Sequence, residues 1–157
     1  STRVNFYELA EQQGRQAATK VIKIKKIHGP ADIRSHFNIA KTAKLLEISR
    51  LRYLEERPVL FEKIYLVESA FPQLNKRDLT ASLTTILKQD YGQEINKEEN
   101  NIKVKAIYDE PAQLLQLNDG SPCLNINRRR FSKTGELIEF DVEYWVHNAI
   151  ELVINSH

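Results

Sequence analysis

The chain has 157 residues, of which 41% are hydrophobic and 28% are charged, and these are the proportions of one ordinary globular domain. Its formal net charge of +2 argues against a nucleic-acid-binding surface made by bulk basicity. The single cysteine, Cys123, excludes an internal disulfide and fits a reducing cytoplasm. No apolar run approaches the ~18 residues of a membrane span, and no signal peptide is visible. We therefore expect one cytoplasmic domain that does not enter a membrane.

The first half of the chain predicts short helices and three strands. Phe6, Leu9 and Ala10 form a helical apolar stripe, which Gly14 ends. Alternating β-branched and polar residues then favour strands, and the polar turn 55–58 joins two of them into a hairpin. In chain order, the expected elements are a helix over 4–13, a strand over 19–27, a helical turn over 31–37, and strands over 44–54 and 59–68.

The second half predicts one amphipathic helix and three more strands. Asp78 is suited to cap a helix over 79–89, which Gly92 would stop, and the polar residues 96–101 indicate a turn or bulge. The remaining elements are expected to be a strand over 102–108, a short helix over 112–117, and strands over 123–132 and 137–154, the last with a bulge near 147–148. Hairpins with short helices between them make an α+β domain built on an antiparallel β-sheet.

Sequence motifs of the common enzyme classes are absent from the chain. It contains no dinucleotide-binding G-x-G-x-x-G, no Walker loop and no G-x-S-x-G nucleophile elbow. The four histidines show no spacing typical of metal ligands. We therefore expect neither catalysis nor a cofactor nor a metal ion.

Two arginines in the strand over 44–54 are the strongest candidates for a binding site. Arg50 and Arg52 share one face of this strand, roughly 6.6 Å apart, because side chains alternate between faces. Two guanidinium groups on one face of a sheet form a fork that suits a phosphate or a carboxylate. The alternative is a pair of exposed arginines without a ligand.

Further polar residues are candidates to complete this site. An odd-length turn between the two strands would place Glu62 on the same face as Arg50 and Arg52. A carboxylate on an otherwise apolar face must be compensated, so Glu62 either orients the arginines, accepts hydrogen bonds from ligand hydroxyls, or forms one internal salt bridge. Ser82, near the start of the long helix, suits an anion but equally a helix cap or a surface position. Glu139, together with Tyr144 and Trp145, suits a polyol or sugar, and equally a sheet core with one ion pair.

The order of these residues resembles the UTRA domain, the effector-binding half of HutC-type regulators in the GntR superfamily. The resemblance covers nearly the whole chain, and its segments are individually weak but specific in order and spacing. They are Asn5-Phe6-Tyr7-Glu8-Leu9 with Gly14, Ser49-Arg50-Leu51-Arg52, Arg57-Pro58-Val59 with Glu62 and Tyr65-Leu66, Phe71-Pro72, Ser82-Leu83, Tyr91-Gly92, Ala112 to Leu117, Gly120-Ser121-Pro122, Arg128, Gly135, and Glu139 to Trp145.

The resemblance implies a chorismate-lyase-like fold for a single domain over 1–157, with residues 1–3 as a linker remnant and a ligand pocket over the sheet. It also implies a homodimer that reaches DNA only through an N-terminal winged helix-turn-helix domain, which this chain lacks. The absence of methionine is consistent with a fragment. The implied function is to sense a small anion, such as a sugar phosphate or a histidine-pathway acid, and to control DNA binding, usually by relieving repression.

By motif position, the resemblance implies binding roles for ten residues. The anion-binding pair is Arg50 and Arg52. Further contacts to the phosphate end come from Ser82, Phe6 and Tyr7, the rest of the ligand is held by Glu62, Glu139 and Trp145, and Thr84 and Tyr144 are additional candidates.

Two departures from the family pattern leave the identity of the ligand open. Many sugar-phosphate sensors carry Ser or Thr where this chain has Tyr7, and Arg-Gly-Asp where it has Val146-His147-Asn148. Two other functions also stay open. One is a chorismate-lyase-like enzyme whose arginine-rich pocket binds a dicarboxylate. The other is a dimerisation module without a ligand, in which Arg50 and Arg52 would be exposed to solvent.

Overall fold

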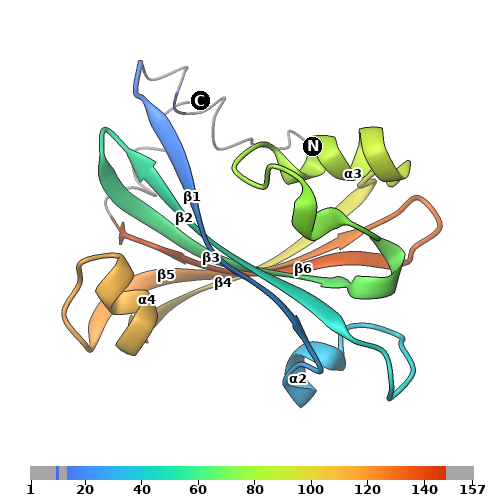
Figure 1. Cartoon of the computed structure of the whole chain (residues 1–157). Coiled ribbons are helices and arrows are strands. Elements are labelled where there is room, and N and C mark those ends of the chain that lie inside the picture. The colour runs from blue at the N-terminus through green and yellow to red at the C-terminus, as the bar shows by residue number, and fades with distance from the viewer. Residues whose placement is uncertain (1–9, 11–13, 148–157) are drawn as a thin grey trace.

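Six antiparallel strands form one sheet in the order β1-β2-β3-β6-β5-β4 (Figure 1). The computed structural model describes residue 10 and residues 14–147. The strands are β1 (Ala17–Ile27), β2 (Leu45–Leu54), β3 (Arg57–Val67), β4 (Lys97–Ile107), β5 (Ser121–Phe131) and β6 (Leu137–Trp145). The α+β architecture predicted from the sequence is confirmed.

Three short helices and two 3₁₀ turns connect the strands. Helix α3 (Leu83–Tyr91) and the connection before it lie over one face of the sheet, which we call the α3 face (Figure 1). Helices α2 (Ala31–Arg34) and α4 (Asp109–Leu114) lie over the opposite face. The 3₁₀ turns span Glu68–Ala70 and Leu74–Lys76.

Apolar side chains fill the space between the sheet and the helices on both faces. On the α3 face, Leu83 and Leu87 of α3 join Ile48 of β2 in one buried cluster. On the opposite face, Ile33 of α2 joins Tyr65 of β3 in another. Each such side chain contributes roughly 1.5–3 kcal/mol when it is fully removed from water. The short helices are therefore held in place mainly by packing on the sheet.

The hairpin of β2 and β3 differs from its prediction in a way that matters for the site. Glu55 and Glu56 form a two-residue turn with left-handed φ angles of 50° and 66°, whereas the turn was predicted over 55–58. A register shift follows, because Val59 has no partner between Pro58 and Leu60 in the ladder to β2. This β-bulge supplies the extra residue that the turn lacks.

The predicted helix over 79–89 begins four residues later than expected. Ser82, not Asp78, is the N-cap of α3, and its hydroxyl accepts a hydrogen bond from the Thr85 amide at 3.3 Å. Asp78 instead accepts a hydrogen bond from the Thr80 amide at 3.1 Å. Its carboxylate therefore stabilises a local turn that competes with helix formation.

Two strand predictions are also wrong. The polar residues 97–101, predicted as part of a turn or bulge, belong to β4, because cross-strand ion pairs such as Glu99–Arg129 offset their low strand preference. Strand β6 ends at Trp145, before the predicted end, and the part of the prediction over 148–154 lies outside the described residues. The predicted helix over 4–13 is described only at Ala10, and the predicted bulge only at its first residue. Within the described ranges, no helix has the length and apolar character to cross a membrane.

Candidate functional site

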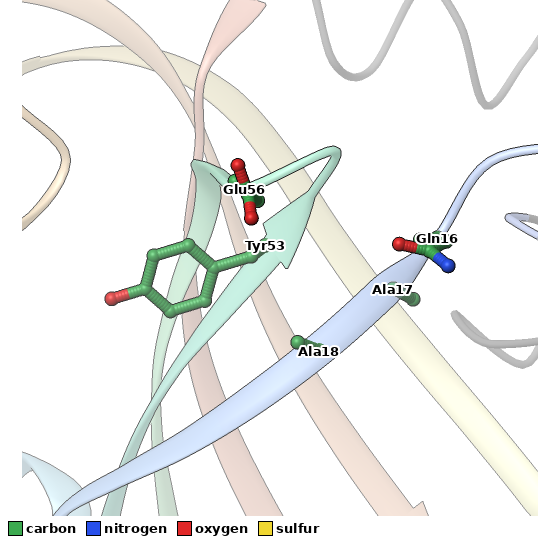
Figure 2. A pocket seen from close by; sticks show the side chains of 5 residues that line it. All are labelled: Gln16, Ala17, Ala18, Tyr53 and Glu56. Carbon is green, nitrogen blue, oxygen red and sulfur yellow. The ribbon is translucent and has the colours of Figure 1, made fainter.

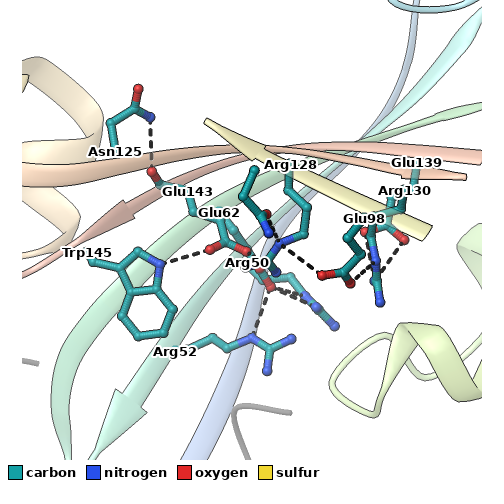
Figure 3. A network of polar contacts seen from close by, with 11 residues as sticks. Arg50, Arg52, Glu62, Glu98, Asn125, Arg128, Arg130, Glu139, Glu143 and Trp145 are labelled. Atoms are coloured by element: carbon teal, nitrogen blue, oxygen red, sulfur yellow. Dashed lines mark hydrogen bonds and ion pairs between the residues drawn. The ribbon is translucent and has the colours of Figure 1, made fainter. Parts of the chain in front are cut away.

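A band of charged side chains crosses the α3 face of the sheet (Figure 3). The strand registers align it, because Arg50 is opposite Glu62, and Glu62 is opposite Glu143. At its far end, Arg130 lies between Glu98 and Glu139 on the neighbouring strands. We call this set the charged band, and its members are Arg50, Arg52, Glu62, Glu98, Arg128, Arg130, Glu139, Asp141 and Glu143.

The two arginines of β2 converge on one carboxylate oxygen. Oε1 of Glu62 accepts hydrogen bonds from Nε of Arg50 at 2.7 Å and from Nε of Arg52 at 3.0 Å, and Nη2 of Arg50 lies 2.7 Å from it. Arg50 and Arg52 are only 4% and 8% exposed. A module without a ligand was expected to leave both arginines in solvent, and the structure does not show that arrangement. Glu62 thus orients both guanidinium groups.

Arg50 also connects the sheet to the start of α3. Its Nη1 donates hydrogen bonds to the carbonyl oxygens of Leu79 and Ala81, each at 3.2 Å. Ser82, the N-cap of α3, follows directly in the chain. The arginine pair and the amino-terminal end of a helix are therefore neighbours, and both favour negative charge.

Glu143 organises the middle of the charged band. Its Oε1 accepts a hydrogen bond from the indole N–H of Trp145 at 2.8 Å, and its Oε2 accepts one from Nη1 of Arg128 at 3.0 Å (Figure 3). Glu143 is 2% exposed and Trp145 is 7% exposed. Both carboxylate oxygens of a buried acid are satisfied, as burial of a charge requires.

Arg130 holds the carboxylates at the far end of the band. It donates from Nη1 to Oε2 of Glu139 at 3.3 Å and from Nε to Oε1 of Glu98 at 2.9 Å. Burial alone would raise the pKa of Glu139, but Arg130, a hydrogen bond with Asp141 and the charge of Arg50 together lower it. Burial would also raise the pKa of Glu62, yet Arg50 and Arg52 outweigh it and lower that pKa to about 2.

The structure brings some of the predicted site residues together. Five of them lie on the α3 face in or beside the charged band: Arg50, Arg52, Glu62, Glu139 and Trp145. Ser82 and Thr84 are half-buried at the start of α3. Tyr144 lies on the opposite face, where its ring stacks on Phe61 with centroids 6.4 Å apart. Phe6 and Tyr7 lie outside the described residues.

Sequence reasoning missed two buried acids of the band, Asp141 and Glu143. The signal was present, because Glu139, Asp141 and Glu143 occupy alternate positions of one strand and therefore share a face. All three are at most 3% exposed. Arg128 and Arg130, the partners of Glu143 and Glu139, lie on β5, and the pairing of β5 with β6 is not visible in the sequence.

A separate pocket of about 570 Å³ lies at the end of the sheet where β1 begins and β2 ends (Figure 2). Its lining residues are Gln16, Ala17, Ala18, Tyr53 and Glu56. None of them belongs to the charged band or to the ten predicted site residues. Across the described part of the chain, no group of His, Cys, Asp and Glu side chains is arranged to hold a metal ion.

Comparison with protein families gives one match over most of the chain. The model of the UTRA domain matches residues 12–151. Among curated proteins, the chain is similar to YihL of Escherichia coli K12, described as an uncharacterized HTH-type transcriptional regulator, with 20% identity over 152 residues. The match covers 96% of this chain but only 64% of YihL, so the chain spans less than two thirds of that relative.

Solved structures share the fold. The effector domain of PhnF from Mycobacterium smegmatis is 19% identical, with a TM-score of 0.84, and the match covers 92% of this chain and 89% of that one. The C-terminal domain of Yurk from Bacillus subtilis is 21% identical, with a TM-score of 0.76, and the match covers 82% and 89% of the two chains.

Proposed function

This chain belongs to the UTRA domain family, and on that premise we propose that it is the effector-binding domain of a HutC-type transcription regulator of the GntR superfamily. The effector is a small anion such as a sugar phosphate, and it binds on the α3 face. Its binding controls a separate N-terminal DNA-binding domain and releases a repressor from its operator. In this proposal the chain itself catalyses no reaction.

The observation that carries this proposal is the convergence of Arg50, Arg52 and the start of α3. Arg50 contacts the carbonyl of Ala81, one residue before the N-cap Ser82. A helix of this kind presents backbone N–H groups without helical partners at its first turn, and these favour an anion. Glu62 holds both guanidinium groups in position, so an incoming anion meets donors that are already oriented.

The neighbouring acids suit the remainder of a polyhydroxylated ligand. Glu62 and Glu139 are acceptors for hydroxyl groups, and Trp145 offers an aromatic surface for the apolar face of a sugar ring. All three lie on the same face of the sheet as Arg50. A sugar phosphate combines the two kinds of group that this face accepts, a phosphate and several hydroxyls.

Control of DNA binding needs only a difference in affinity between two arrangements of the regulator. An effector that binds one arrangement more tightly shifts the population toward it. The arginine pair lies on β2, whereas the carbonyls that Arg50 contacts lie in the connection before α3. An anion that competes for Arg50 therefore acts on two separate elements of the domain at once.

We also propose that the domain forms a homodimer through β4. This strand is at one end of the sheet, and its outer edge pairs with no other strand of the described chain. Ile102 and Val104 on β4 are 60% and 73% exposed. An exposed strand edge with apolar side chains is a template for pairing with a second copy.

A thermal-shift panel tests the anion proposal. Sugar phosphates are compared with the same sugars lacking phosphate, because only the phosphorylated forms engage the arginine pair. A phosphorylated ligand at about 100 times its Kd adds roughly 2.7 kcal/mol to the free energy of unfolding. Arg52→Gln should abolish the shift, whereas Arg129→Gln, a matched change at an arginine outside the charged band, should preserve it. A shift that survives in Arg52→Gln refutes the proposed site.

A further inference from the structure

Asp141 occupies the centre of the charged band and differs from the other acids there. It lies on β6 between Glu139 and Glu143, with Ile64 of β3 on one side and Arg128 of β5 on the other. Its residue is 3% exposed. Its Oδ1 accepts no hydrogen bond, and it is the one buried side-chain N or O atom of the described residues without a hydrogen-bond partner.

The guanidinium groups of the band are engaged by other carboxylates. Arg50 and Arg52 donate to Glu62, Arg128 donates to Glu143, and Arg130 donates to Glu98 and Glu139. Within the described chain, Asp141 forms no ion pair with any of them. If Asp141 were ionised, its Oδ1 would be a buried charged oxygen with neither a hydrogen bond nor an ion-pair partner, and a carboxylate in that position takes up a proton instead.

We propose that Asp141 is a neutral carboxylic acid whose proton is shared with Glu139, and that anion binding on this face of the sheet is coupled to that proton. The first half of the proposal concerns the ligand-free domain alone. The second half rests on the proposed function, because it requires the anion to bind at Arg50 and Arg52.

Electrostatics favours Asp141 over its neighbours as the proton holder. Burial raises the pKa of Asp141 well above its usual range, and the charge of Glu139 and the hydrogen bond with Glu139 raise it further. Arg130 opposes this rise and Glu143 adds to it. Burial raises the pKa of Glu143 as well, but Arg128 and Trp145 donate to its two oxygens and oppose that rise, whereas Oδ1 of Asp141 has no donor within the described chain. The other charged groups of this face are Glu62 on β3, Glu98 on β4, and Arg50 and Arg52 on β2.

The coupling follows from charge. An anion at Arg50 and Arg52 adds negative charge to the face that carries Asp141, and added negative charge favours the protonated acid. By linkage, the protonated domain binds the anion more tightly than the deprotonated domain. In the pH range where Asp141 is partly ionised, binding of each anion takes up a fraction of a proton from solvent. The affinity of the domain for the anion therefore falls as pH rises.

The neutral acid is tested by stability as a function of pH. The pKa of Asp141 is higher in the folded than in the unfolded chain, so its stabilising contribution is complete below the unfolded value of about 4 and is lost as pH rises toward the folded value. Asp141→Asn keeps the shape and removes the proton equilibrium. Urea unfolding from pH 5 to 9 should show the wild-type folding constant falling, relative to this variant, by up to about tenfold per pH unit.

Asp32→Asn, which changes an exposed aspartate of α2, is the matched control and should follow the wild-type curve. Parallel curves for the wild type and Asp141→Asn would overturn the proposal. A second measurement uses the wild type alone: the ¹³C carboxyl resonance of Asp141 should stay at the protonated position well above about pH 4, the ordinary range of an aspartate. An Asp141 resonance that moves to the deprotonated position at about pH 4 also overturns the proposal.

The coupling is tested with sulfate, an anion that does not itself titrate in this pH range. The sulfate-induced rise in Tm should shrink with pH in the wild type and stay constant in Asp141→Asn. If the sulfate-induced rise in Tm has the same pH dependence in both proteins, the coupling is overturned. The stability measurement then still decides whether Asp141 is neutral. If neither sulfate nor any sugar phosphate changes Tm, the proposed anion site and the coupling both fail, while the stability and resonance measurements still decide the state of Asp141.

Discussion

Arg50 on β2 and Glu62 on β3 lie directly opposite each other and form a buried ion pair in which two guanidinium nitrogens are each 2.7 Å from one carboxylate oxygen. Both residues are 4% exposed. Such a pair is far more costly to break from one side than to form, because the remaining charge stays buried.

Glu62→Gln should therefore destabilise the domain strongly. The variant leaves Arg50 and Arg52 buried beside a neutral amide, and we expect a loss of about 3 kcal/mol in the free energy of unfolding. Urea unfolding at pH 7 measures it. Glu136→Gln, in the exposed turn between β5 and β6, is the control and should change stability by less than about 0.5 kcal/mol. A small effect at Glu62 would show that the arginines are held by other groups.

The same pair predicts how acid unfolds the domain. The pKa of Glu62 is lowered to about 2 in the folded chain, below its ordinary value of 4.5. Its contribution to stability is therefore present above the unfolded value and is lost as pH falls from about 4.5 toward 2. Acid titrations followed by circular dichroism should show a steeper loss of stability in this window for the wild type than for Glu62→Gln. Equal slopes contradict the prediction.

Removing the indole N–H of Trp145 should lower the free energy of unfolding measurably. Trp145→Phe deletes the hydrogen bond to Oε1 of Glu143, which is worth about 1.5–3 kcal/mol when the acceptor is charged. Tyr144→Phe removes a hydroxyl from the adjacent residue on the opposite face and serves as the control, with an expected change within about 0.5 kcal/mol. Chemical unfolding of both variants distinguishes the two costs.

Relieving backbone strain in the turn between β2 and β3 should stabilise the domain. Glu56 adopts a φ angle of 66°, a left-handed conformation that costs a residue with a side chain about 1 kcal/mol and that glycine adopts freely. Glu56→Gly should raise the melting temperature. Lys133→Gly, in the turn between β5 and β6 where this residue has no positive φ, should lower it or leave it unchanged. Stabilisation by both variants would exclude backbone strain as the cause.

The proposed dimer edge makes a prediction about association. Val104→Lys places a charge on the exposed edge strand, and charged side chains on such edges prevent pairing. Sedimentation equilibrium should show a dimer for the wild type and a monomer for the variant. Asn101→Lys, on the other face of the same strand, tests whether added charge alone dissociates the dimer. An unchanged dimer in Val104→Lys places the interface elsewhere.

The alternation of residues along β2 was enough to predict that Arg50 and Arg52 share a face, because side-chain direction is a local property of a strand. Glu62 was expected on the arginines' face only if the turn had an odd length, and it reaches that face through a bulge instead. The turn has two residues, and without the bulge at Val59 the residue opposite Arg50 would be Phe61, with Glu62 on the other face. A bulge of this kind depends on the whole sheet and has no clear sequence signal.

The remaining partners of the charged band could not be predicted for a related reason. Arg130 contacts Glu98 only because β4 pairs with β5, and the polar start of β4 was interpreted as a turn. The start of α3 was misplaced because Asp78 and Ser82 are both good caps, and only packing of the helix on the sheet decides between them. Local chemistry therefore predicted the arginine pair, while long-range strand pairing determined what surrounds it.

The strand order divides the sheet into two three-stranded halves, β1-β2-β3 and β6-β5-β4, and only the ladder between β3 and β6 joins them. That ladder spans Leu60–Tyr65 and is shorter than the other four. The charged band lies across this seam, with Arg50 and Arg52 on one side and Glu143 on the other. We expect a molecule that contacts both sides to restrain the relative motion of the two halves at the shortest ladder of the sheet, and the rest of the domain to respond to that change in rigidity.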